Sequence, residues 1–212
     1  MKLSLPVGSV TILRNGNADA PTLVVLAHGA GAGMSSDYME HFARGLATDS
    51  VAVCRFNFLY SEAGKRAPDR QLVLEDTYRA VVDSLRAGGV AQRVFLGGKS
   101  MGGRIASNIV ASGTQCDGLV FLGYPLHPPG RPDRMRDEHL AQIEPPMLFV
   151  EGTRDPFCPL DTLRQVIRAR SLHAEVVVIE DGDHSLKVRK SSGRSTPEAW
   201  DEAVTAISRW IR

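Results

Sequence analysis

The stretch Arg93-Val-Phe-Leu-Gly-Gly-Lys-Ser-Met-Gly-Gly-Arg-Ile-Ala-Ser-Asn108 decides the fold. Its apolar start is typical of a strand buried on both faces, and Ile105 and Ile109, four residues apart, indicate one side of a helix. Between strand and helix lies the pattern G-x-S-x-G, centred on Ser100. A chain that reverses so quickly needs strained dihedrals, and glycines beside the serine relieve crowding against neighbouring elements. The turn would present the serine hydroxyl and leave the amide of Met101 unpaired at a helix start.

Two other glycine-rich signatures fail in this chain. A phosphate-binding loop, G-x-x-x-x-G-K-[ST], would need glycine at position 93, where Arg93 stands. A dinucleotide fingerprint in the loop after His28 would need glycine at position 34, which is Met34. The serine turn alone does not establish catalysis, because G-x-S-x-G also arises by chance, so the rest of the chain must supply its partners.

The composition is that of an ordinary globular protein. The chain has 212 residues, 43% of them hydrophobic and 23% charged, which predicts one domain over residues 1–212. A formal net charge of +1 gives no indication of a nucleic-acid partner or a membrane surface. Pro6 and Gly8 interrupt the N-terminal apolar residues too early for a signal peptide. Three cysteines without a metal-ligand spacing favour a reducing compartment, so we expect a cytoplasmic protein with no metal and no cofactor.

Short apolar runs alternate with helical patterns along the chain. The runs predict strands at residues 10–14, 22–27, 51–56, 94–96, 118–123, 147–150 and 176–179. Because most runs are solidly apolar and helices separate them, we predict an α/β fold with a mostly parallel sheet covered on both sides. The turn signal Asn15-Gly-Asn17 predicts that the first two strands pair antiparallel at an edge. Ser195-Thr-Pro-Glu198 predicts the capping box of the last helix.

Candidate catalytic side chains follow three successive strands, and ligands bind at the carboxyl ends of parallel strands. Ser100, Asp155 and His184 stand in the order nucleophile, acid, base. Taken singly, the aspartate is typical of a turn and the histidine of a solvated loop. Three agreements of residue type, order and strand-end position are far harder to obtain by chance. Asp181 and Asp183 are too near the histidine in sequence to occupy a separate strand end.

The glycine-rich loop at residues 28–33 follows the second strand. The amide of Ala30 could face that of Met101, and two such donors form an oxyanion hole for a tetrahedral acyl intermediate. The alternative is a plain tight loop beside a strand.

With these residues in place, the chain resembles an α/β-hydrolase over nearly its full length. It is most similar to a small, lidless branch near the dienelactone-hydrolase-like proteins, which includes testis-expressed proteins and a hydrolase-like domain of a chromatin-modifying complex. The matching stretches are residues 28–33, 55–57, 96–104, 152–157 and 182–187. The resemblance implies Ser100 as nucleophile, Asp155 as orienting acid and His184 as base, with Met101 and Ala30 as oxyanion donors. Dienelactone hydrolases more typically carry cysteine at the nucleophile position, so the serine departs from their pattern.

We therefore predict a serine hydrolase that cleaves a small carboxylic ester or thioester, acting as a monomer or homodimer on a small-molecule acyl substrate. A non-catalytic binding or scaffold protein that keeps the fold is the alternative from another class. A peptidase or an acyltransferase using the same three residues also stays open.

Residues that follow the predicted strands are the candidate substrate contacts: His28, Gly31, Asn57, Tyr124 and Leu126. We expect Tyr124, Leu126 and His127 to line an open pocket, since residues 124–146 form the only long connection after the nucleophile. For His28, a structural role in fixing the oxyanion loop competes with a role in the site.

Four basic residues lie near predicted strand ends and could attract an anionic substrate: Arg55, Lys99, Arg104 and Arg154. Solvent exposure or salt bridges account for most such residues. Lys99, inside the serine turn, stays without an assigned role.

Overall fold

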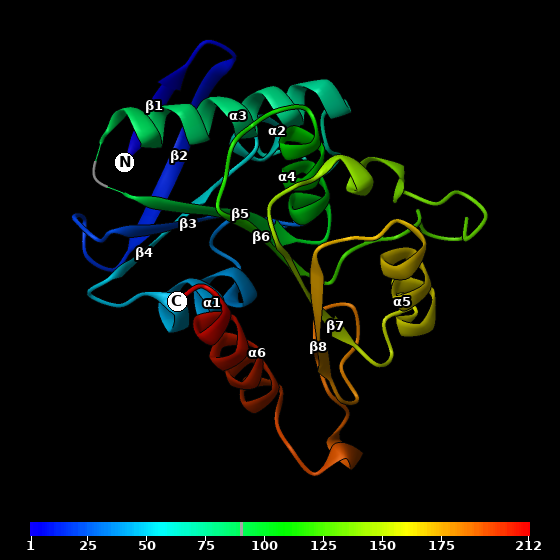
Figure 1. Cartoon of the computed structure of the whole chain (residues 1–212). Coiled ribbons are helices and arrows are strands. Elements are labelled where there is room, and N and C mark those ends of the chain that lie inside the picture. The colour runs from blue at the N-terminus through cyan, green and yellow to red at the C-terminus, as the bar shows by residue number, and fades with distance from the viewer. Residues whose placement is uncertain (90) are drawn as a thin grey trace.

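A single eight-stranded sheet runs through the molecule in the computed structural model, which describes residues 1–89 and 91–212 (Figure 1). Its order is β1-β2-β4-β3-β5-β6-β7-β8. The strands are β1 (Lys2–Leu5), β2 (Gly8–Asn15), β3 (Thr22–Ala27), β4 (Val51–Phe56), β5 (Arg93–Lys99), β6 (Gly118–Leu122), β7 (Met147–Gly152) and β8 (Ala174–Ile179). From β4 to β8 all neighbours are parallel. The predicted α/β fold is confirmed.

The apolar runs form the strands for the reason their composition predicts. Every residue of β3, β4, β6 and β7 is buried, because helices cover both faces of the sheet. The edge strand β8 is only half-buried along most of its length.

The helices form one layer on each side of the sheet (Figure 1). They are α1 (Asp37–Leu46), α2 (Leu59–Glu62), α3 (Gln71–Ala87), α4 (Met101–Ala111), α5 (Leu160–Ala169) and α6 (Thr196–Trp210). The apolar faces of α1 and α6 pack in one core cluster, and those of α3, α4 and α5 pack in the other. The predicted capping box is present at the start of α6, where the Ser195 and Glu198 side chains bond each other's backbone amides.

The edge of the sheet differs from the prediction. The strand at residues 10–14 belongs to β2, which pairs antiparallel with β4 and not with β3. Both edges of β3 are occupied by the parallel strands β4 and β5, so the incoming strand adds to the free edge of β4. The unpredicted strand β1 completes a hairpin with β2. The expectation of an edge pair between the first two predicted strands was therefore wrong.

The connection at residues 123–146 carries one short 3-10 helix, Glu138–Gln142, and no larger cap over the strand ends. This agrees with the predicted minimal lid. Within residues 1–89 and 91–212, no helix is both long enough and apolar enough to cross a membrane.

Candidate active site

The turn between β5 and α4 holds Ser100 in a strained conformation. Its φ of 50° and ψ of −112° lie outside the ordinary regions for a residue with a side chain. A Cβ on Gly98 or Gly102 would stand 2.1 or 2.2 Å from the carbonyl oxygen of Ala27 on β3. The two glycines thus let the turn pack directly on the neighbouring strand, as the pattern predicts. Ser100 is the N-cap residue of α4 and follows the carboxyl end of β5 directly.

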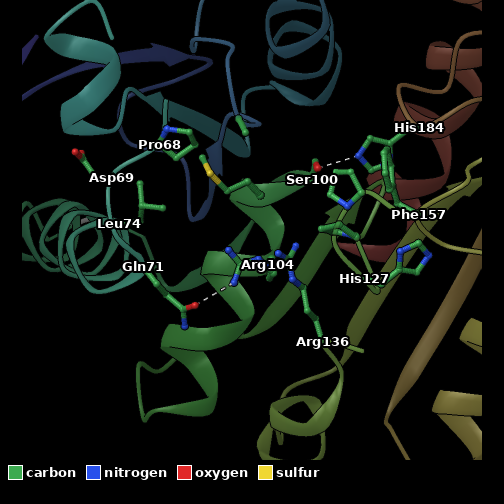
Figure 2. Close-up of a pocket in the computed structure, with 14 residues that line it drawn as sticks. Pro68, Asp69, Gln71, Leu74, Ser100, Arg104, His127, Arg136, Phe157 and His184 are labelled. Carbon is green, nitrogen blue, oxygen red and sulfur yellow. Dashed lines mark hydrogen bonds between the residues drawn. The ribbon is translucent and has the colours of Figure 1, made fainter. Parts of the chain in front are cut away.

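Three side chains from separate strand ends form a continuous hydrogen-bonded series. Ser100 Oγ lies 2.8 Å from His184 Nε2, and His184 Nδ1 lies 2.6 Å from Asp155 Oδ2 (the serine–histidine bond is dashed in Figure 2). Asp155 follows β7 and His184 follows β8, so the parallel sheet brings together residues that are 84 and 29 positions apart. The structure therefore places the three predicted residues within hydrogen-bonding distance.

The environment of Asp155 fixes how the histidine carries its proton. The carboxylate is completely buried, and its other oxygen accepts a 2.8 Å hydrogen bond from the amide of Phe157. An acceptor-only carboxylate requires a proton on His184 Nδ1, which leaves the lone pair of Nε2 facing the serine hydroxyl. The Phe157 ring meets the imidazole edge-on, at 4.6 Å between ring centroids. The imidazole is held in the orientation that a base toward Ser100 requires.

The loops after β7 and β8 are locked to each other. The amide of Arg154 donates to the carbonyl of Gly182 at 2.8 Å. A Cβ on Gly152 would lie 2.1 Å from that same carbonyl oxygen, so the two backbones are in direct contact. Trp200 on α6 donates its indole N–H to the carbonyl of Ser185 at 3.0 Å. This packing fixes the distance between the acid and the histidine.

Two backbone amides beside the serine have no partner within the described residues. Neither the Ala30 nor the Met101 N–H donates a hydrogen bond there, and both residues line the same cavity as Ser100. The loop that carries Ala30 packs closely on the turn, since a Cβ on Gly29 would lie 3.7 Å from the Cβ of Ser100. The positions suit a pair of donors to a developing oxyanion.

The cavity at this site has a volume of about 300 Å³. Its walls come from the loop after β3, the start of α3, α4 and the loops after β6, β7 and β8. The lining residues are Ala30, Pro68, Asp69, Gln71, Leu74, Ser100, Met101, Arg104, Pro125, His127, Pro129, Arg136, Phe157 and His184.

The five candidate substrate contacts do not line this cavity, which corrects the prediction. His28 is completely buried: its Nδ1–H donates to the Gly29 carbonyl at 2.8 Å and its Nε2 accepts from the Phe58 amide at 3.2 Å. It is a structural histidine. Asn57 accepts from the Met34 amide at 2.9 Å. Gly31 is exposed beyond the cavity wall.

Tyr124 and Leu126 are also fully buried, while their neighbours Pro125 and His127 line the cavity. Side chains of an extended segment point alternately to opposite sides. The alternation therefore turns the tyrosine and the leucine into the core and the histidine toward the site. The expected role of His127 agrees with its placement.

A family model of the alpha/beta hydrolase domain matches residues 20–212. The chain belongs to the α/β-hydrolase family. A curated relative from Salmonella typhimurium, named "Putative carboxymethylenebutenolidase", is 28% identical over 149 residues, which cover 64% of this chain and 52% of the relative. The chain thus spans about half the length of the curated relative it matches.

Solved structures support the same fold for this α/β-hydrolase. A serine hydrolase without a lid from Xanthomonas campestris aligns with a TM-score of 0.74 at 19% identity, covering 99% of this chain and 93% of its own. Dienelactone hydrolase from Anabaena variabilis aligns with a TM-score of 0.76 at 18% identity, covering 99% of this chain and 94% of its own. The predicted likeness to lidless and dienelactone-hydrolase-like proteins is confirmed.

No group of three or more histidine, cysteine or acidic side chains is arranged to hold a metal ion within the described parts of this α/β-hydrolase.

Lys99 occupies a largely enclosed position beneath the histidine. Its ammonium donates to the carbonyl of His184 and lies 5.6 Å from the ring centroid of Tyr38. Burial lowers the pKa of Lys99 to about 8, against the opposing effect of Asp155 and of Glu151. The sequence alone assigns no role to Lys99. In the structure its hydrogen bond connects the end of β5 to the loop that carries His184.

Glu151 lies near this lysine and is completely buried. One carboxyl oxygen accepts from the Tyr124 amide at 2.6 Å, and the other has no partner within the described residues. Burial, followed by the nearby Asp155, raises the pKa of Glu151. The raised pKa favours the protonated form of Glu151, because burial away from water disfavours a charged carboxylate.

The burial of Lys99 predicts a pH-dependent stability. The pKa is about 8 in the folded state and about 10.5 in the unfolded chain, so the unfolded state binds more protons between these values and stability rises with pH there. We expect the free energy of unfolding of the wild type, relative to Lys99→Met, to increase by about 3 kcal/mol from pH 8 to pH 10.5. Urea unfolding of the wild type and of Lys99→Met at several pH values measures this difference in the free energy of unfolding.

The exposed Lys65 supplies the control, because Lys65→Met should differ from the wild type by the same amount at every pH. A pH-independent difference between the wild type and Lys99→Met would show that the enclosed ammonium carries no such penalty.

Proposed function

We propose that this α/β-hydrolase cleaves a small carboxylic ester or thioester through an acyl-enzyme on Ser100. The observation that carries the proposal is the hydrogen-bonded series from Ser100 through His184 to Asp155, with the free amides of Ala30 and Met101 beside the serine. A nucleophile, a base, an orienting acid and an oxyanion hole are the parts that acyl transfer needs.

The reaction follows from the positions of these groups. His184 Nε2 takes the proton as Ser100 Oγ bonds to the acyl carbon, and the amides of Met101 and Ala30 bind the resulting oxyanion. The imidazolium, stabilised by Asp155, then gives its proton to the departing alcohol or thiol. Water, deprotonated by the same nitrogen, attacks the acyl carbon. The bond from that carbon to Ser100 Oγ then breaks, the imidazolium returns its proton to Oγ, and the carboxylic acid leaves.

The shape of the site supports a short or exposed acyl group. The cavity of about 300 Å³ is at the small end of ligand sites, and the connection at residues 123–146 provides no helical cap above it. The names of the curated relative and of the aligned structures are those of hydrolases, which agrees with this reaction class. We place the protein in the cytoplasm, because Cys54, Cys116 and Cys158 are unpaired and a reducing compartment keeps them so.

Covalent labelling tests the proposal directly. A fluorophosphonate should add one phosphonyl group to the folded protein, and peptide mapping should place it on Ser100. Ser100→Ala and the urea-denatured wild type should stay unlabelled, because one lacks the hydroxyl and the other lacks the base. Equal labelling of Ser100→Ala, or no labelling of the folded wild type, would contradict the assignment. A non-catalytic scaffold would give the second result. Ester, thioester and peptide substrates then separate the reactions that use the same groups.

A further inference from the structure

Two arginines of the cavity wall, Arg104 and Arg136, direct their side-chain ends toward the same space (Figure 2). Arg104 lies one turn into α4, and Arg136 lies in the connection after β6. Figure 2 shows both side-chain ends reaching into the same space below Ser100, between Gln71 on one side and His127 on the other. The cavity therefore joins the reactive serine to a region of concentrated positive charge.

Neither arginine forms an ion pair with a carboxylate of the described residues. The acidic side chains around them have other partners. Asp137 binds Arg170 at 2.6 Å. Glu75 accepts hydrogen bonds from the side-chain amide nitrogens of Gln71 and Asn108 at 2.8 and 2.9 Å. Asp69, on the cavity wall, accepts from the Tyr60 amide at 2.9 Å.

The N–H groups of the Arg104 guanidinium form few hydrogen bonds within the described residues. Its buried Nε has no hydrogen-bond partner within the described residues, and one terminal nitrogen reaches the Gln71 side-chain oxygen only at 3.4 Å. A guanidinium offers five N–H donors in a planar fork that matches a carboxylate or a phosphate. An anion between the two forks would supply the missing acceptors.

Backbone hydrogen bonds fix the main chain of both arginines before any ligand binds. The Arg104 amide donates to the Ser100 carbonyl at 3.0 Å in the first turn of α4. The Arg136 amide donates to the Leu126 carbonyl at 2.7 Å, and its carbonyl accepts from the Tyr124 hydroxyl at 3.2 Å. A ligand would then meet the cost of ordering the side chains alone.

The two charges also disfavour each other. Burial, and then the neighbouring Arg104, lower the pKa of Arg136, and burial lowers that of Arg104. Two like charges in one partly buried space are unfavourable until an opposite charge joins them.

We propose that Arg104 and Arg136 form an anion subsite that binds an acidic group of the ester substrate. This inference rests on the proposed function of Ser100. One helical turn separates the arginine from the serine along α4, a rise of about 5 to 6 Å. Because both arginines and Ser100 line one cavity of about 300 Å³, the proposal places the acidic group a few bonds from the reacting carbonyl. Half-esters of short dicarboxylic acids have this length on the acyl side, and esters of acidic alcohols or phenols have it on the leaving-group side.

Matched pairs of esters test the subsite. On the acyl side, mono-p-nitrophenyl glutarate is compared with p-nitrophenyl butyrate. On the leaving-group side, 3-acetoxybenzoate is compared with phenyl acetate. The measured quantity is the ratio of kcat/KM for the acidic ester to that for the neutral ester. We expect this ratio to exceed one in the wild type on one of the two sides, after correction for the chemical reactivity of the esters.

Arg104→Gln and Arg136→Gln should each lower that ratio by about tenfold or more, since each removes a charge-assisted hydrogen bond. Raised salt should lower the wild-type ratio as well. Arg104→Lys should recover part of the loss, because it keeps the charge without the fork. Arg168→Gln is the matched control: it removes the same charge from an exposed position on α5, and its ratio should equal that of the wild type.

Calorimetry with glutarate keeps the subsite testable without turnover. Glutarate should bind the wild type at low salt and bind both glutamine variants at least tenfold more weakly, with thermal unfolding confirming that each variant folds. Unchanged ester ratios together with unchanged glutarate affinity would overturn the subsite. Glutarate binding without ester cleavage or fluorophosphonate labelling would overturn the proposed function and leave the subsite supported.

Discussion

Ser100→Ala is expected to lower kcat for a good ester substrate by about 10⁴- to 10⁶-fold. Among the described residues that line the cavity, Ser100 carries the only hydroxyl, and His184 Nε2 lies 2.8 Å from its Oγ, in position to take its proton. Without this hydroxyl no acyl-enzyme forms, and the residual rate comes from substrate binding and the free amides of Ala30 and Met101. Stopped or continuous assays with p-nitrophenyl acetate measure the loss, with variant protein purified separately from the wild type.

The same helix offers a matched control for this substitution. Ser107 also lies 2.8 Å from a histidine Nε2, that of His139, but it is completely buried and does not line the cavity. Ser107→Ala therefore removes an equivalent hydroxyl and an equivalent hydrogen bond without exposing or removing a nucleophile. We expect its kcat to stay within a few-fold of the wild type at a temperature where it is folded. Similar losses in the two variants would indicate damage to α4 instead of chemistry at Ser100.

The serine turn was predictable from sequence because each requirement is local. Gly98 and Gly102 lie so close to β3 that a side chain at either position would clash with it. The positive φ of Ser100 follows from the short path between strand and helix. The placement of Asp155 and His184 was also predictable, since the carboxyl ends of parallel strands share one edge of the sheet. Strand order was less accessible: nothing local in residues 8–15 specifies β4 as the partner of β2 instead of β3.

The cavity wall illustrates a second limit. The segment after β6 was expected to face the site through Tyr124 and Leu126, but those side chains enter the core and Pro125 and His127 face the cavity. A shift of one residue in an extended segment reverses every side chain, and sequence does not fix that register in a loop. Arg136 could not be found, because its place beside the serine depends on how the connection at residues 123–146 folds back onto α4.

Asp155→Asn is expected to lower kcat by about 10⁴-fold while preserving the fold. The aspartate accepts a hydrogen bond from His184 Nδ1–H, at 2.6 Å between nitrogen and oxygen, and its other oxygen accepts one from the Phe157 amide. In the variant, the amide oxygen can keep the bond to Phe157, so its NH₂ group faces Nδ1 and donates to it. The imidazole must then carry its proton on Nε2, where it can no longer accept the proton of Ser100. Hydrolysis of p-nitrophenyl acetate gives the size of the loss, and the variant also lacks a negative charge beside the imidazolium.

Asp183→Asn separates this tautomer effect from a general loss of charge. Asp183 stands next to His184 in sequence, but its Oδ1 accepts from the amides of Ser185 and Lys187, and an asparagine oxygen can accept both bonds. The variant thus removes one negative charge near the histidine without presenting a donor to Nδ1, and we expect less than a tenfold change in kcat. Comparable losses in Asp155→Asn and Asp183→Asn would mean that the local negative charge, and not the orientation and tautomer of the imidazole, supports the reaction. A large difference between them assigns the orienting role to the buried carboxylate, because the two substitutions change the charge by the same amount and differ in what they present to Nδ1.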